Sequence, residues 1–264
     1  MSVLDTSLAI VGLAAIAGLC QGLTGFGFAL VFTPIAALLL PPREVVLAAE
    51  VIGGSLGALI VLETRRSLPW ARCRRMIVLS CVAAPLGAVT LLAIDVSLLR
   101  IVVSVVAFAS AIAFVAFRTV PIRHESLALG WVGAIGGFLN GCTSMGAPPA
   151  ALLIANQQWN VAASRSTLAT FNFASLLASI GTAMALGAFH EGSLRSVALA
   201  TPAAIIGTFF GSWIARRCSP AAFRSALVGI VILTSATTLV VSTVESFAHG
   251  SPLVPTVQRQ KPGG

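Results

Sequence analysis

The chain has 264 residues, of which 57% are hydrophobic and 9% are charged, and its mean hydropathy is +0.99. Ordinary soluble domains carry roughly 25% charged residues, so this composition excludes a soluble domain and indicates an integral membrane protein with several helices. The net charge of +8 comes from 16 basic and 8 acidic residues. Because the arginines stand in short stretches between apolar segments, we interpret this charge as a mark of loop orientation and expect no nucleic-acid binding.

Eight apolar segments succeed one another along the chain. The first follows M-S-V-L-D-T, which lacks the basic residues of a cleavable signal, so we expect it to belong to the mature structure. Six segments have near the ~20 residues that one helical crossing needs, whereas the first and the fifth are longer. A polar tail, 246–264, has too little apolar surface to pack and is predicted to be disordered. The segments span residues 8–40, 45–62, 76–94, 99–117, 127–155, 166–186, 196–214 and 223–243.

The two long segments share an eleven-residue motif. From Ala17 the first copy reads A-G-L-C-Q-G-L-T-G-F-G, and from Gly136, 119 positions later, the second reads G-G-F-L-N-G-C-T-S-M-G. Glycine weakens a helix, and threonine or amide side chains in lipid need polar partners, so the motif predicts an interruption inside each segment. The offset is close to half of the chain, which favours an internal duplication with repeats at 1–122 and 123–245.

Each long segment permits two topologies. It is either a kinked crossing, which gives eight spans, or a re-entrant hairpin whose halves of ~14 residues reach ~21 Å into a ~30 Å hydrocarbon core. Short cytoplasmic loops carry an excess of arginine. With the loop 63–75 inside and the tail excluded, simple crossings place eight arginines inside and six outside, whereas hairpins place eleven and three. The hairpin partition predicts an all-α polytopic membrane protein with two inverted repeats, each a hairpin followed by three helices, as in many secondary transporters.

The tips of such hairpins have the chemistry of an anion site. Irregular backbone is tolerated in a membrane only where it is buried in protein or lines a cavity. The second half-helix of each hairpin points N–H groups and partial positive charge toward the tip. The alternative is that the small residues only pack helices closely. The candidate substrate-binding residues in the two copies are Gln21, Gly22, Thr24, Gly25, Gly27, Asn140, Gly141, Thr143, Ser144 and Gly146.

A second matched stretch follows each hairpin, now with an offset of 122 residues. It aligns Arg43 with Arg165 and Glu50 with Asn172. Glu50 lies within an apolar segment, where an acid is a functional candidate; it could carry a coupling proton or pair with Arg43. Arg165 could bind the anion or only mark topology, and we count Arg165 and Asn172 among the candidate binding residues.

Other site chemistry is poorly represented in this sequence. The five cysteines have no C-x-x-C spacing, and we interpret them as buried small hydrophobes. The three histidines fall in loops or in the tail, so we expect no metal site and no cofactor. Because the spans hold no Ser/His pair, no paired carboxylates and no histidine cluster, an enzyme is disfavoured.

Three stretches together resemble the sulfite exporter TauE/SafE family of membrane permeases. They are G-L-C-Q-G-L-T-G-F-G-F with a following proline, its echo G-F-L-N-G-C-T-S-M-G-A-P-P, and W-N-V-A-A-S-R-S-T-L-A-T. The resemblance covers the chain to about residue 245. Ser144, Met145 and Ala147 stand where the glycine-richest version of the second motif has glycines.

The resemblance implies a multi-pass permease of the bacterial cytoplasmic membrane. Its partners would be a small inorganic or organosulfur anion such as sulfite or sulfoacetate, usually moved outward, the lipid bilayer, and a coupling ion, H⁺ or Na⁺. We expect alternating access around a midplane site. A passive anion channel, with a constriction between two re-entrant half-helices, is the alternative. The sequence makes no prediction of oligomeric state.

Overall fold

The computed structural model describes residues 3–115, 122, 124–189 and 191–217. These residues form helices and no strand. The predicted span 223–243 and the tail 246–264 lie outside the described residues. The helices are α1 (Val3–Thr24), α2 (Phe28–Ala36), α3 (Pro42–Thr64), the short 3-10 helix η1 (Arg65–Ser67), α4 (Trp70–Ala93), α5 (Val96–Val115), α6 (Glu125–Thr143), α7 (Ala147–Asn156), α8 (Val161–Ala185) and α9 (Glu191–Ala215).

The distribution of apolar and polar side chains is that of a membrane protein. Five of the described helices have the length and hydropathy of a membrane crossing, and they are α1, α3, α4, α8 and α9. Large apolar side chains such as Val82, Trp131 and Phe209 face outward, whereas Gln21, Glu50 and other polar side chains are fully buried. Lipid tolerates the first group, and the second must find partners inside the bundle.

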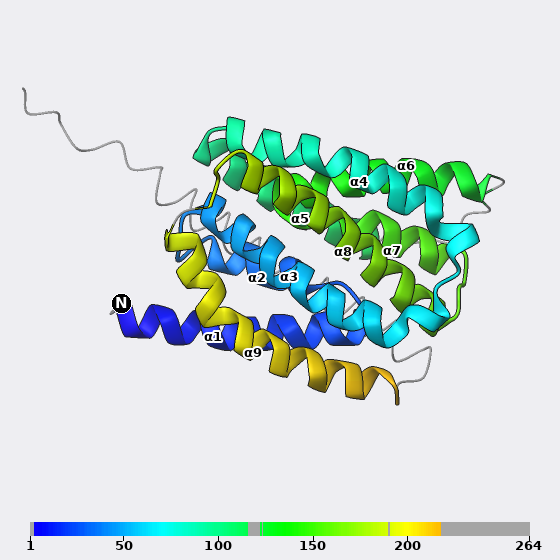
Figure 1. The fold of residues 1–264 in the computed structure, drawn as a ribbon, viewed down its shortest axis with the longest axis horizontal. Coiled ribbons are helices and arrows are strands. Elements are labelled where there is room, and N and C mark those ends of the chain that lie inside the picture. Colours follow the sequence, from blue (N-terminus) through cyan, green and yellow to red (C-terminus); the bar gives the residue numbers. More distant parts are fainter. Residues whose placement is uncertain (1–2, 116–121, 123, 190, 218–264) are drawn as a thin grey trace, which may run out of the picture.

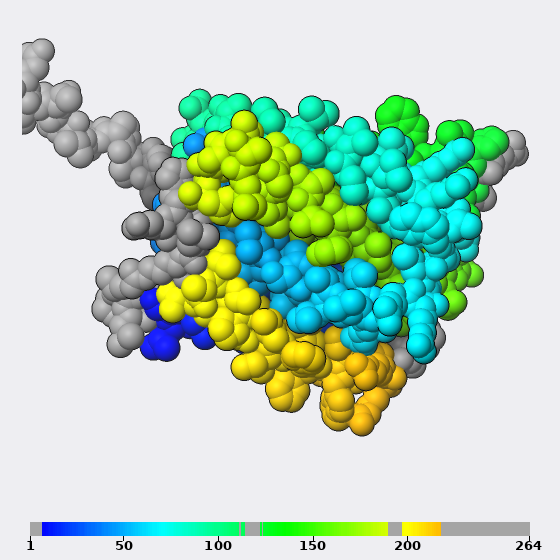
Figure 2. Space-filling view, in the orientation of Figure 1, coloured from blue at the N-terminus to red at the C-terminus, as the bar shows by residue number. Residues whose placement is uncertain are grey.

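The bundle has two outer helix pairs on either side of a central pair. α1 packs along α9, α4 packs along α6, and α3 lies against α8 between them (Figure 1). In the space-filling view α3 is visible between α8 and α9 (Figure 2). Helices from the two halves of the sequence are therefore interleaved, and neither half forms a separate body.

Glycines set the closeness of the two outer pairs. A Cβ on Gly22 would collide with backbone atoms of α9, and a Cβ on Gly141 would collide with backbone atoms of α4. In each pair, the numbers of the contacting residues increase together along both helices. Gly133 contacts Met76 and Gly137 contacts Ser80, while Gly18 contacts Ala204 and Gly22 contacts Thr208. Each pair is therefore parallel, and small residues allow the helices to approach as closely as they do in other membrane bundles.

We expect Gly137→Ala to lower the free energy of unfolding in detergent by ~1–3 kcal/mol, because the new methyl group overlaps the backbone of Ser80. Gly181→Ala is the matched control, since a Cβ there meets nothing within 4 Å. The control should be neutral or stabilising by up to ~1 kcal/mol, as is usual when alanine replaces a helical glycine. Denaturant titration of both variants would contradict the packing argument if they behaved alike.

Both long segments are interrupted inside the predicted motif. The first break separates α1 from α2 at residues 25–27, and the second separates α6 from α7 at residues 144–146. The arms are unequal, with 22 and 9 residues in the first segment and 19 and 10 in the second. The expectation of equal halves of ~14 residues was therefore wrong, because the apolar run does not reveal where within it the helix stops.

Three of the arginines, Arg43, Arg165 and Arg216, lie at the ends of the bundle that the hairpin arrangement predicts for them. Glu63, at the end of α3, contacts both Arg165 and Arg216, so the starts of α4 and α8 and the end of α9 share one end of the bundle. Arg43 donates to the carbonyl of Ile94 at the opposite end. Simple crossings would have put Arg165 and Arg216 on the side opposite the loop 63–75, so they do not fit this fold.

Candidate anion site at two helix breaks

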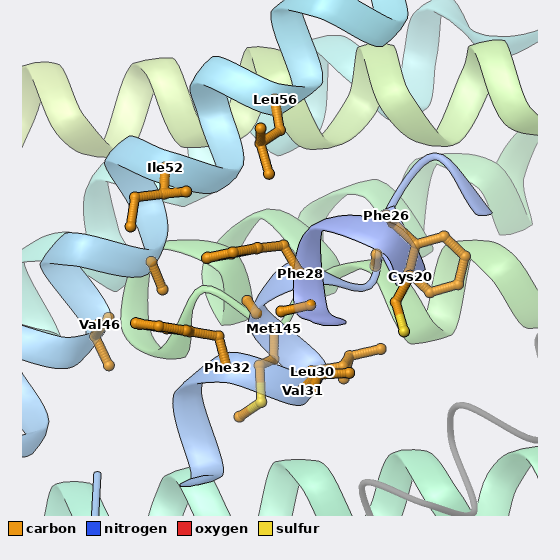
Figure 3. Close-up of a cluster of buried hydrophobic side chains, with 14 of the residues drawn as sticks. Cys20, Phe26, Phe28, Leu30, Val31, Phe32, Val46, Ile52, Leu56 and Met145 are labelled. Carbon is orange, nitrogen blue, oxygen red and sulfur yellow. The ribbon is translucent and has the colours of Figure 1, made fainter. Parts of the chain in front are cut away.

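The two breaks lie inside an apolar core. Phe26 and Phe28 flank the first break and are buried, and Phe28 stacks on Phe32 with ring centroids 4.9 Å apart. Met145, from the second break, lies among the same side chains (Figure 3). The second break therefore contacts α2, and the side chains around both breaks are buried.

The first break is closed by hydrogen bonds from its own motif. Gln21 Oε1 accepts the N–H of Phe28 at 3.0 Å, which caps the first turn of α2. The Thr24 hydroxyl lies 2.9 Å from the Cys20 carbonyl and accepts the N–H of Phe26 at 3.2 Å. Gly25 and Gly27 have φ values of 86° and 125°, where a side chain would be strained. The glycines thus make the turn, and the amide and hydroxyl side chains hold it.

The second break repeats this arrangement. Asn140 Oδ1 accepts the N–H of Gly146 at 2.6 Å, and the Thr143 hydroxyl donates to the Leu139 carbonyl and accepts the N–H of Met145. Ser144 takes the place of Gly25 and adopts a left-handed φ of 63°. Glutamine is one methylene longer than asparagine, so Gln21 reaches a residue one position further along its motif.

The two amide nitrogens differ in their partners. Asn140 Nδ2 donates to Asn172 Oδ1 at 2.9 Å and to Ser175 Oγ at 2.6 Å. Gln21 Nε2 is fully buried and has no partner among the described residues. A buried donor without an acceptor is costly, so the first break holds a hydrogen-bonding group that no described residue satisfies.

The first turns of the two half-helices differ in composition. In α2 the N–H groups of Ala29 and Leu30 find no acceptor among the described residues. In α7 the corresponding turn contains Pro148 and Pro149, which have no N–H. Pro148 lies in the first turn of α7, whereas Pro34 lies inside α2. Each break therefore holds one buried side-chain donor without a partner among the described residues, Gln21 Nε2 at the first and the Ser144 hydroxyl at the second.

Glu50 lies near the second break and is fully buried. Its Oε1 accepts the Ser179 hydroxyl at 2.7 Å, and its Oε2 has no partner among the described residues. The alternative that Glu50 pairs with Arg43 is wrong, because Arg43 donates to Ile94 instead.

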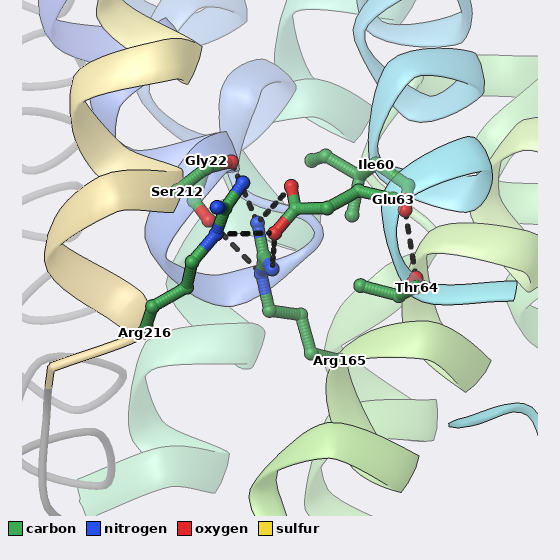
Figure 4. A network of polar contacts seen from close by, with 7 residues as sticks. All are labelled: Gly22, Ile60, Glu63, Thr64, Arg165, Ser212 and Arg216. Atoms are coloured by element: carbon green, nitrogen blue, oxygen red, sulfur yellow. Dashed lines mark hydrogen bonds and ion pairs between the residues drawn. The ribbon is translucent and has the colours of Figure 1, made fainter. Parts of the chain in front are cut away.

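Arg165 joins the first break to three helices. Its Nε donates to the Gly22 carbonyl at 3.1 Å, and its Nη atoms donate to both Glu63 oxygens and to Ser212 Oγ at 2.6 Å (Figure 4). Arg216 approaches the same carboxylate at 3.2 Å. Arg165 is 5% exposed, so in this conformation its guanidinium is committed to the protein and not presented to an anion.

The predicted site residues belong to one or the other of the two breaks, or pack helices together. Arg165 joins the first motif and Asn172 joins the second, whereas Gly22 and Gly141 serve helix packing. Four further residues of these networks were not predicted from the sequence: Glu63, Ser175, Ser179 and Ser212. The one signal for Glu63 was a single acid beside a cluster of arginines, which we assigned to a loop.

Comparison with known proteins supports this picture at the level of a family. No curated protein and no solved structure matches the chain. The family model of the sulfite exporter TauE/SafE matches residues 10–238, which include both breaks and their partners. The chain belongs to the sulfite exporter TauE/SafE family.

Proposed function

We propose that this protein is a secondary transporter that exports a small sulfur-containing anion, such as sulfite or an organosulfonate, across the bacterial cytoplasmic membrane. The family supports transport of sulfur anions. The observation that carries the finer proposal is the first break, where Gln21 Nε2 and two α2 N–H groups are buried and find no acceptor in the described part of the chain. Helix N-termini are well suited to anions.

The anion binds at this break and accepts hydrogen bonds from Gln21 and the first turn of α2. Three neutral donors in a dry core satisfy the oxygen atoms of sulfite without placing a fixed charge in the membrane. The second break contributes less, because Asn140 Nδ2 already donates to Asn172 and Ser175, and its unpartnered side-chain donor is the Ser144 hydroxyl. The site is occluded in this conformation, as alternating access requires of one state.

Two inverted repeats provide the two states. The pairing of α1 with α9 is matched by the pairing of α6 with α4, and α3 meets α8 at the centre. This exchange pattern is the one expected when α1–α4 and α6–α9 are related by a pseudo-two-fold axis in the membrane plane. Movement of one outer pair against the central helices would open the break to one side of the membrane.

Glu50 is the proposed coupling group. A buried carboxylate with one unpartnered oxygen is unfavourable, and we infer that H⁺ or Na⁺ joins this oxygen during the transport cycle. An ion bound at Glu50 would compensate the charge of the anion carried past the second break.

Proteoliposomes test the function and the coupling together. We expect the wild-type protein to accumulate sulfite against its gradient when a pH or Na⁺ gradient is applied. Glu50→Gln keeps the acceptor for Ser179 but cannot take up a proton or Na⁺, so it should lose uphill accumulation and retain sulfite–sulfite exchange. Glu44→Gln, in the first turn of α3, is the control and should behave as the wild type.

A passive anion channel remains the competing function for the same fold. A channel would only dissipate the sulfite gradient and would ignore pH and Na⁺ gradients, so that result in the wild type would remove the transporter proposal. A thermal-shift screen against sulfite, thiosulfate, sulfoacetate, sulfate and formate then identifies the preferred anion.

A further inference from the structure

A groove lies between the first halves of α4 and α6, away from the two breaks. Its volume is about 800 Å³, within the ~300–1,000 Å³ range of small-molecule pockets. Its walls are apolar except at one end, where two guanidinium groups and one hydroxyl are placed. The lining residues are Trp70, Arg74, Arg75, Val78, Leu79, Ser126, Leu127, Gly130, Trp131 and Ala134.

The position of the groove follows from the helices that carry it. Arg74 and Arg75 lie in the first turns of α4, at the end of the bundle that also holds η1 and the start of α8. From Leu127 to Ala134 the apolar wall follows two turns of α6, or about 10 Å. Trp70 and Trp131 are largely exposed, as tryptophans at a membrane–water boundary are.

The charge at the polar end is positive and uncompensated by nearby acid. Glu125, at the start of α6, is paired with Arg72 at 2.8 Å and accepts the indole N–H of Trp159. Arg75 donates to Ser126 Oγ at 2.9 Å, which leaves its charge in place. No described residue pairs with Arg74. The groove therefore combines a cationic mouth with an apolar floor.

We propose that this groove binds one anionic phospholipid of the cytoplasmic leaflet, with its phosphate at Arg74 and Arg75 and an acyl chain along Val78, Leu79 and Ala134. Basic clusters beside membrane helices attract anionic head groups, and guanidinium groups bind phosphate with two parallel hydrogen bonds. The absence of a side chain at Gly130 leaves room for the acyl chain in the groove, because a Cβ there would lie 3.2 Å from the Leu79 side chain.

A second copy of the chain fits this surface less well. A two-fold dimer places the same patch of both copies face to face, so two concave grooves would meet and the arginines of both copies would repel each other. A single acyl chain fills a narrow concave surface without that conflict. The proposal concerns a lipid and does not depend on which anion is transported.

Tryptophan quenching by brominated lipids tests the site directly, because Trp70 and Trp131 line it. In phosphatidylcholine vesicles with a small fraction of brominated phosphatidylglycerol, we expect wild-type quenching to exceed that by the same fraction of brominated phosphatidylcholine. Arg74→Gln with Arg75→Gln should weaken the preference, roughly fivefold for each arginine removed. Arg65→Gln with Arg66→Gln removes the same charge outside the groove and should preserve the preference.

Ala134→Phe fills the floor and leaves both arginines, so it should also reduce quenching by brominated phosphatidylglycerol. Equal quenching of the wild type by the two brominated lipids would overturn the proposal. The proposal would also be overturned if the two arginine double variants lost the preference for phosphatidylglycerol to the same extent, since general surface charge would then explain it. If Ala134→Phe dissociates a dimer and leaves lipid quenching unchanged, the groove is an interface between copies and the lipid proposal fails.

Discussion

Gln21→Glu is expected to weaken sulfite binding by ~10- to 200-fold at neutral pH while the protein stays folded. The substitution keeps the oxygen that accepts the Phe28 N–H and replaces the unpartnered Nε2 donor with a second acceptor. A hydrogen bond to a charged group contributes ~1.5–3 kcal/mol, and a negative charge beside the anion adds repulsion. Burial of the new carboxylate also lowers stability, so sulfite affinity is to be compared under conditions where the variant is folded.

The measurement is a sulfite titration followed by thermal shift, together with uptake in proteoliposomes. Gln157→Glu, at the C-terminal end of α7, makes the same chemical change away from the break and should leave sulfite affinity unchanged. Unaltered affinity in a folded Gln21→Glu variant would place the anion elsewhere.

Asn140→Asp provides a contrast at the equivalent position of the second motif. Its nitrogen already donates to Asn172 and Ser175, so the change removes two buried hydrogen bonds. It should therefore reduce stability more than Gln21→Glu does. Two residues that align in the sequence thus have different expected effects, and the reason is the partner that each amide nitrogen has.

The breaks themselves were predictable because their cause is local. Gly25 and Gly27 require backbone conformations that other residues avoid, and Thr24 and Thr143 bond within their own turns. A motif that supplies both features interrupts a helix whatever surrounds it. The same locality explains why the alignment of Gly25 with Ser144 held, since both take a left-handed φ.

The partners of the site residues were not predictable, because they depend on packing between distant segments. Glu50 looked like a partner for Arg43, because seven residues are about two turns of a helix. Its oxygen instead accepts a hydrogen bond from Ser179 on another helix. Arg165 looked like a ligand or a marker of topology, and no pattern near it pointed to Glu63 or Ser212. The inverted relation between the repeats stays a prediction that these contacts support.

Arg165→Gln is expected to lower the free energy of unfolding by roughly 3 kcal/mol. Removing one partner of a buried ion pair costs ~3–5 kcal/mol, and the lower end applies because the Glu63 side chain is 23% exposed and keeps Arg216 as a neighbour. The substitution also leaves the Gly22 carbonyl and Ser212 without their donor. The first break should therefore lose its attachment to α3, α8 and α9.

Arg216→Gln is the matched control, since it removes the same charge from the same carboxylate. Its side chain is 66% exposed, and exposed ion pairs contribute at most ~1 kcal/mol. Arg165→Lys should restore only part of the stability, because an ammonium group cannot bond both Glu63 oxygens and the Gly22 carbonyl in the same planar arrangement. Denaturant titration and sulfite transport should both rank wild type, Arg216→Gln, Arg165→Lys and Arg165→Gln in that order. Equal stability of the two glutamine variants would mean that the buried contacts with Gly22 and Ser212 do not hold the break in place.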